Sequence, residues 1–173
     1  MRKELYRLGI IAVLLAGIII YVDFNNRISS FSTPTEALRN LEDPTLEIQE
    51  ILETIYVDDH YAYLYFYSEI TEPKDYICVS TFRKGTYGWK YVDMFGGGKI
   101  TKDNTNGSLK SGDGDYLLGF ATAEVASVQL EEQKADLLPL VGTDFQLWVF
   151  HRLDPALIDR EIQFFDTNGK VIH

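Results

Sequence analysis

The feature that most constrains this chain is an uncharged apolar run near the N-terminus, from Leu8 to Val22. Ten of its fifteen residues are Leu, Ile or Val, and each of these favours insertion at the centre of a membrane helix by roughly 0.3 to 0.6 kcal/mol. Fifteen helical residues extend about 22 Å, less than the roughly 30 Å hydrocarbon core of a bilayer, but Leu5, Tyr6 and Phe24 lengthen the run. The sequence therefore predicts a single transmembrane helix.

A cleaved signal peptide has a similar basic start and apolar centre, so the residues after the run decide between the two. Signal peptidase requires small residues at its cleavage site, whereas Tyr21, Val22, Asp23 and Phe24 are all larger. No cysteine follows the run closely, which excludes a lipoprotein anchor. The apolar segment is therefore predicted to remain in the protein as an anchor.

Basic residues set the orientation of a membrane helix, because the flank richer in Lys and Arg stays in the cytoplasm. Arg2, Lys3 and Arg7 precede the run, and only Arg27 follows it closely. We therefore expect a cell-membrane protein with a cytoplasmic stub and anchor over 1–24, a linker over 25–33 and an extracytoplasmic domain over 34–173.

The composition of the remaining chain is that of a folded, acidic domain. The sequence is 46% hydrophobic and 13% aromatic, which is enough apolar surface to offset the entropy lost on ordering. Residues 1–27 carry a net charge of +2, which leaves −12 for 28–173 because the whole chain carries −10. Such a domain is repelled by nucleic acids and by anionic lipid headgroups. Cys78 is the only cysteine, so an intramolecular disulfide is impossible.

The domain is predicted to begin with one or two short helices. Thr33, Pro34 and Glu36 form a helix start with a capping box, and a helix from Pro34 to about Leu41 follows. The next segment, 44–56, fits two structures. Its Ile and Leu residues fall on one helical face, which slightly favours a helix, but a bulged strand fits the same pattern.

From His60 onward the apolar period changes to two, which is typical of strands. A hairpin is expected over 76–94 with Lys84 and Gly85 in its turn, and a long polar loop over 99–115. Further strands are expected over 116–122, 124–130, 144–151 and 160–166, with a tight turn at Asn168 and Gly169 before a last strand. The predicted fold class is α+β, mostly antiparallel β, as a sandwich or open barrel.

The order of these pieces resembles small uncharacterised membrane-anchored extracytoplasmic proteins of Gram-positive bacteria. The matching features are the anchor followed by Glu36-Ala37-Leu38, Gly88-Trp89-Lys90, Val125 to Val128, Trp148, and the ending Asp166, Asn168, Gly169, Val171 and Ile172. The resemblance implies a location and an architecture, and it implies no activity.

Motifs for catalysis, cofactors or metals are not apparent, so we assign no catalytic, cofactor-binding or metal-binding residue. His60, His151 and His173 lack metal-ligand spacing. Oxygen ligands suited to calcium lie in the glycine-rich loop, but their spacing does not fit an EF-hand. These loop residues are Asp103, Asn104, Asn106, Asp113 and Asp115.

The most distinctive pattern is a row of tyrosines that would lie along one face of one strand. Together with Trp89 these rings could form an open aromatic platform for sugar rings or an extended peptide. The alternative is that they pack beneath a helix or a second sheet. The ligand-binding hypothesis therefore concerns Tyr61, Tyr63, Tyr65, Tyr67 and Trp89.

The function expected from these features is that of a tethered binding or interaction module outside the membrane. Its partner would be an envelope glycan or a neighbouring membrane protein, and no nucleic acid. The alternative is a membrane-anchored hydrolase acting on envelope polymers, with Asp58 and Asp59 as acid and base. Adjacent carboxylates on a strand point to opposite faces, which counts against that pair.

Overall fold

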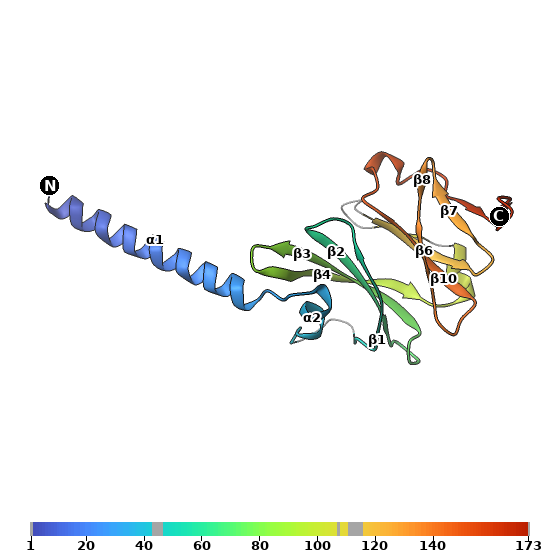
Figure 1. Ribbon diagram of the computed structural model, residues 1–173, viewed down its shortest axis with the longest axis horizontal. Coiled ribbons are helices and arrows are strands. Elements are labelled where there is room, and N and C mark those ends of the chain that lie inside the picture. Colours follow the sequence, from blue (N-terminus) through green and yellow to red (C-terminus); the bar gives the residue numbers. More distant parts are fainter. Residues whose placement is uncertain (1, 43–46, 107, 111–115, 173) are drawn as a thin grey trace.

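The computed structural model describes residues 2–42, 47–106, 108–110 and 116–172, with the side chains of 2–9, 12, 106, 108–110 and 155 left out. In this part of the chain an isolated N-terminal helix leads into a mostly antiparallel β structure (Figure 1). The predicted α+β class with mostly antiparallel strands is therefore confirmed.

The described strands form three four-stranded sheets. Sheet A is a meander in the order β1-β2-β3-β4, sheet B has the order β5-β6-β10-β9, and sheet C has the order β12-β11-β7-β8. The bounds in sheet A are β1 Glu50–Tyr56, β2 Tyr61–Ser68, β3 Tyr76–Gly85 and β4 Gly88–Lys99. Those in sheet B are β5 Ser108–Lys110, β6 Tyr116–Thr122, β9 Asp136–Pro139 and β10 Phe145–His151. Those in sheet C are β7 Ser127–Leu130, β8 Gln133–Lys134, β11 Gln163–Phe165 and β12 Val171–Ile172.

The sheets stack in layers with a separate apolar core between each pair. One core lies between helix α2 (Pro34–Arg39) and sheet A, and includes Leu38 and Phe66. A second lies between sheets A and B, and a third, around Trp148, lies between sheets B and C. Strands β2, β6 and β10 are therefore covered on both faces, which explains why their sequences do not alternate between apolar and polar residues.

Helix α1 runs from Arg2 to Ile28 and projects away from the sheets (Figure 1). It therefore continues past residue 24 into the segment predicted as a linker. Phe31, also within that segment, forms an isolated β-bridge with Trp89. Among the helices of the described residues, none is long and apolar enough to cross a membrane.

Helix α2 begins where the sequence predicts. The Thr33 side chain accepts a hydrogen bond from the Glu36 amide at 3.1 Å, as an N-cap does. The Glu36 carboxylate in turn accepts from the Ser32 amide at 3.1 Å. A capping box would place that second bond on Thr33, so the box is shifted by one residue.

The preference for a helix over 44–56 is wrong for the described residues, because 50–56 form strand β1. The register of β1 against β2 shifts between Ile51 and Glu53, so a bulge interrupts the strand. Ile51 then packs toward α2, whereas Leu52 and Ile55 pack toward sheet B. The change of phase at the bulge gives the apolar residues a spacing that resembles a helical period.

The remaining differences are shifts of boundaries and short strands. The hairpin turn lies at Thr86 and Tyr87, and β4 continues through the three glycines to Lys99. A bulge at Gly97 accommodates them, because Ile77 pairs with Gly98 and Cys78 with Gly96. The predicted polar loop contains a short 3-10 helix, η1 (Lys102–Asn106), and strand β5, while 107 and 111–115 lie outside the described residues. Another 3-10 helix, η2, spans Pro155–Leu157.

Candidate functional site

The tyrosine row lies in the core between sheets A and B, which corrects the expectation of an open platform. Tyr63, Tyr65 and Tyr67 are 6%, 0% and 3% exposed, and they pack against Leu118 and Val149 of sheet B. The physical reason is that β2 is an interior strand with α2 on one face and sheet B on the other. The Tyr67 hydroxyl accepts a hydrogen bond from the Val141 amide at 3.1 Å.

The other two residues of the hypothesis lie elsewhere. Trp89 is buried on the opposite face of sheet A, in the core beneath α2. Tyr61 is partly exposed at the end of β2, where the Arg83 guanidinium lies 5.6 Å from the centre of its ring. The structure therefore does not bring the five aromatic side chains onto one surface.

The most specific polar arrangement in the described core is a chain of three side chains from three strands. The Tyr65 hydroxyl of β2 lies 2.8 Å from Nε2 of His151 at the end of β10. Nδ1 of the same imidazole lies 3.2 Å from a carboxylate oxygen of Asp136 at the start of β9. The ring of Tyr63 is centred 4.8 Å from the imidazole. This Tyr65–His151–Asp136 chain therefore connects the interior to the surface.

Burial controls the protonation of this chain. Removal from water lowers the pKa of His151, and the nearby Asp136 carboxylate opposes that effect by favouring the imidazolium. Burial also raises the pKa of Tyr65 well above its ordinary value. A neutral imidazole then satisfies both contacts, with Nδ1–H donating to Asp136 and Nε2 accepting from Tyr65.

An acid, an imidazole and a hydroxyl in series are also the parts of a nucleophilic catalytic triad. A nucleophile must reach its substrate, however, and Tyr65 is fully buried while only Asp136 is exposed. The chain thus joins sheet A to sheet B through polar contacts. It offers no reacting oxygen to a ligand from outside.

The carboxylates of the alternative hydrolase reading have structural contacts. Asp58 accepts hydrogen bonds from the amides of His60 at 2.5 Å and Tyr61 at 2.7 Å, and it pairs with Arg152. These bonds hold the turn between β1 and β2. Asp59 is exposed beside it.

In the described part of the chain, no group of three His, Cys, Asp or Glu side chains could hold a metal ion. Asp113, Asp115 and His173 lie outside that part. In the polar loop after β4, the side-chain amide of Asn104 donates to the Lys99 carbonyl at 2.5 Å. Cys78 is buried, and burial raises the pKa of its thiol to about 12.

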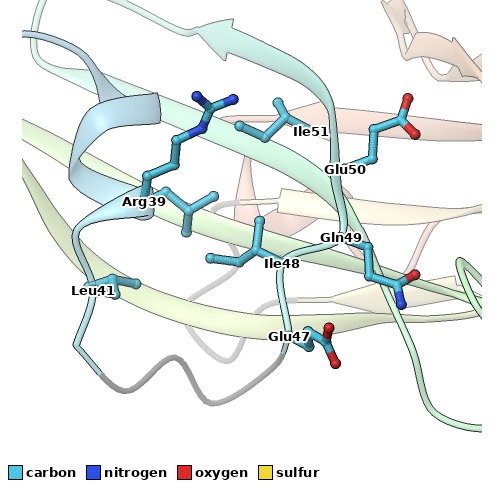
Figure 2. Close-up of a pocket in the computed structure, with 8 residues that line it drawn as sticks. Arg39, Leu41, Glu47, Ile48, Gln49, Glu50 and Ile51 are labelled. Carbon is cyan, nitrogen blue, oxygen red and sulfur yellow. The ribbon is translucent and has the colours of Figure 1, made fainter.

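A groove of about 560 Å³ lies between α2 and the segment that leads into β1 (Figure 2). Its apolar wall continues the core beneath α2, with Leu38 and Ile48 among its members, and Figure 2 shows Ile48 extending toward α2. Arg39 lies on the helix side, whereas Glu47 and Glu50 lie on the strand side. A volume of this size suits a small ligand or a short peptide segment that inserts a side chain.

No family model, curated protein or solved structure matches the chain.

Sequence reasoning identified Tyr65 and His151 separately and missed that they meet. Their separation of 86 residues leaves no local pattern that could have joined them. The groove was missed for a different reason, because the sequence of 44–56 fits both a helix, which it slightly favours, and a bulged strand, and so does not show what Ile48 faces. In the structure Ile48 lies before β1 and packs against the core beneath α2.

Proposed function

We propose that this chain is a membrane-tethered binding module. In this proposal α1 anchors the protein in the cell membrane with its N-terminus in the cytoplasm, and the β domain binds an envelope component or a neighbouring membrane protein outside. The observation that carries the proposal is the apolar surface of α1. The large apolar side chains described from Ile10 to Val22 are each at least half exposed.

An apolar surface of this kind must be shielded from water by protein or by lipid. A helix that is apolar all round is either buried in a large core or surrounded by lipid, and soluble proteins rarely expose so large a contiguous apolar area. The sheets do not cover α1, because the contacts that join it to them involve Asp23 and Asn26 near its end. The charge-free sequence from Leu8 to Val22, part of which lies outside the described side chains, completes the support for a lipid environment.

The groove beside α2 supports the binding part of the proposal. It combines an apolar wall with Arg39 on one side and Glu47 and Glu50 on the other, a combination typical of sites that hold an amphipathic ligand. The hydrolase alternative has no comparable support, because Asp58 holds a turn and the Tyr65 hydroxyl is buried.

The tether is tested by expressing the full chain in a bacterial membrane and extracting the membranes with alkaline carbonate. We expect the chain to remain in the pellet, and protease added outside spheroplasts to remove the β domain while sparing α1. The variant Leu14→Arg/Ile18→Arg should be extracted, because two charges at the centre of the apolar run oppose insertion. Extraction of the unaltered chain would refute the tether.

The groove is tested by photo-crosslinking in the same membranes. A benzophenone amino acid at Leu41, which lines the groove, should give a discrete adduct. The same amino acid at Gln133, in strand β8 of sheet C, is the matched control. Equal labelling patterns from the two positions would rule out the groove as the binding surface.

A further inference from the structure

The turn that joins β3 to β4 lies beside the C-terminal end of α1 (Figure 1). The Tyr87 hydroxyl donates a hydrogen bond to the Asp23 carboxylate, and the Lys90 ammonium donates to the Asn26 side chain at 2.8 Å. The bridge between Phe31 and Trp89 ties the same hairpin to the chain that leaves the helix, with N···O distances of 2.9 and 2.8 Å. These contacts hold the tip of the hairpin beside the C-terminal end of the apolar helix.

This end of the molecule is basic although the protein as a whole is acidic. Four cations gather here, and the ammonium of Lys84 lies 5.6 Å from the centre of the Trp89 ring. Of the nearby acids, Asp58 is paired with Arg152, whereas Asp23, which accepts from the neutral Tyr87 hydroxyl, and Asp59 keep their charges. The four cations therefore exceed the unpaired carboxylates by two. We call the following residues the hairpin-tip patch: Arg27, Arg83, Lys84, Tyr87 and Lys90.

We propose that the hairpin-tip patch is a second membrane contact, which binds the headgroups of anionic phospholipids in the outer face of the membrane. The inference rests on the proposed tether, because a spanning α1 places Asp23 at the edge of the hydrocarbon region and therefore Tyr87 at headgroup depth. Tyrosine is enriched at that depth, since its ring is apolar and its hydroxyl is polar. Lys and Arg beside it can extend their charges to the phosphates.

The net charge of the domain does not oppose this contact. Charge acts over a Debye length of roughly 8 Å at physiological salt, so the headgroups respond to the nearest residues and not to the whole charge of 28–173, which is −12 because the chain carries −10 and residues 1–27 carry +2. The patch is attracted to an anionic surface, and the acidic remainder of the domain is repelled by it. Both effects favour one orientation, with the hairpin tip toward the membrane and sheets B and C away from it.

The test uses the full chain in lipid nanodiscs of phosphatidylcholine, with or without phosphatidylglycerol. A fluorophore is placed at Thr86→Cys on the hairpin tip, and the buried Cys78 should not compete for the label. Quenching by a headgroup-labelled lipid then reports the distance of the tip from the surface. The control label at Val141→Cys lies near Tyr67, at the opposite end of β2 from the tip.

We expect quenching at position 86 to increase by about twofold or more when phosphatidylglycerol is present, and to return to its value in phosphatidylcholine at high salt. The label at 141 should not respond. The increase should be lost in Arg83→Glu/Lys84→Glu, and kept in Lys134→Glu/Lys170→Glu, which alters the net charge equally at exposed positions of the C-terminal half.

Each outcome separates the contact from the tether. Entry of the chain into the nanodiscs, measured by co-elution, tests the tether alone. A chain that enters the discs but shows the same quenching at 86 in both lipids overturns the headgroup contact. The headgroup contact is also overturned if Arg83→Glu/Lys84→Glu and Lys134→Glu/Lys170→Glu lose the increase in quenching equally, because that result would indicate a general effect of net charge. The salt dependence of quenching is measured on the labelled chain without charge substitutions, so the test holds even where a charge-reversal variant misfolds.

Discussion

The hydroxyl of Tyr65 and Nε2 of His151 lie 2.8 Å apart across the interface between sheets A and B. Tyr65 is fully buried, and the His151 side chain at the end of β10 is only 8% exposed, so the packing of the two sheets keeps most of this contact away from water. Protonation of the imidazole removes its acceptor lone pair at Nε2, so the hydrogen bond must reverse: Nε2–H donates to the Tyr65 oxygen, and the hydroxyl hydrogen of Tyr65 loses its acceptor. Charge at this position is therefore coupled to the packing of the two sheets.

We predict that acid weakens the fold through His151. Burial lowers its pKa in the folded state, so the unfolded chain takes up a proton at a higher pH than the native one. The free energy of unfolding should consequently fall as the pH drops from about 6.5 toward the lower folded-state value. Urea unfolding on either side of this window measures the effect. His151→Gln should reduce the loss, whereas His60→Gln, at an exposed position, should leave it unchanged.

Asp136→Asn should enlarge the same acid loss, because the carboxylate favours the imidazolium and its removal lowers the His151 pKa further. A histidine titration by NMR, with His151→Gln for assignment, gives the direction. A pKa that rises in Asp136→Asn would show that the contact between the two side chains is not formed in solution.

The row of tyrosines is predicted to act as core. Tyr63→Ala together with Tyr65→Ala should lower the free energy of unfolding by several kcal/mol, in the range of roughly 3 to 5 kcal/mol found for single buried aromatics or above it. The change also removes the partner of His151. Tyr61→Ala, in which the lost ring is 39% exposed, should cost about 1 kcal/mol or less. Similar costs for both variants would contradict the layered core.

Most strands were predictable because the two-residue spacing of apolar side chains and the turn residues between strands are local features of the sequence. The strand from Tyr116 to Thr122 and the last strand after Asn168 and Gly169 have the predicted positions. In the latter turn Gly169 has φ of 76°, the conformation for which glycine is favoured. The short strands β8 and β9 were not predicted, because two to four residues are too few to establish a period.

The arrangement of the sheets was not predictable from the sequence. Tyr63 and Phe66 lie on opposite faces of β2, and both faces are apolar, so the sequence shows that two layers cover the strand without showing which. The pairing of β10 with β6 joins strands between which β7, β8 and β9 lie in the sequence. The contact of His151 with Tyr65 depends on how sheet A packs on sheet B, which no local pattern in the sequence specifies.

Asp75 is predicted to hold the loop between β2 and β3. Its carboxylate accepts hydrogen bonds from the amides of Ile70 at 2.9 Å, Thr71 at 3.1 Å and Glu72 at 3.2 Å. The first of these bonds has the largest part in lowering the Asp75 pKa to about 2, with Lys99 helping. A lowered pKa means that this stabilisation is present at neutral pH and is lost as the pH falls from about 4 toward 2.

Asp75→Asn should therefore speed hydrogen exchange at the three loop amides at neutral pH and flatten the acid dependence of stability in that range. Glu132→Gln, at the exposed turn between β7 and β8, removes an equal charge and serves as the control. Unchanged exchange at Ile70 and Thr71 in Asp75→Asn would show that the carboxylate does not hold the loop.

Gly88→Ala tests the joint between the N-terminal segment and sheet A. Gly88 has φ of 132°, and a Cβ there would lie 2.3 Å from the Phe31 carbonyl oxygen. Backbone must then move, so we expect loss of the bridge between Phe31 and Trp89. Gly142→Ala also has a positive φ, 79°, but meets no atom within 4 Å, so it isolates the conformational cost of about 1 kcal/mol. The unfolding midpoint of Gly88→Ala should be clearly the lower of the two.

The last prediction is that residues 30–173 fold without α1 into a soluble domain with one cooperative unfolding transition. The three cores draw their described members from Phe31 onward, whereas the side-chain hydrogen bonds of Asp23 and Asn26 to the hairpin are exposed. Exposed polar contacts contribute little to stability. The reference is the detergent-solubilised full chain with Asp23→Asn, in which the contact of residue 23 with the hairpin is already weakened. The fragment without α1 should have nearly the same urea midpoint as this reference.

A fragment that begins at Pro34 is the informative comparison, because it lacks both the Thr33 N-cap and the Phe31 strand bridge. Loss of an N-cap alone costs about 1 kcal/mol, and loss of the bridge exposes the buried Trp89. The shorter fragment should unfold at lower urea with a similar dependence on denaturant, since the cores are the same. Equal midpoints for the two fragments would show that the segment before α2 is not part of the domain, and aggregation of both would show that the cores depend on α1.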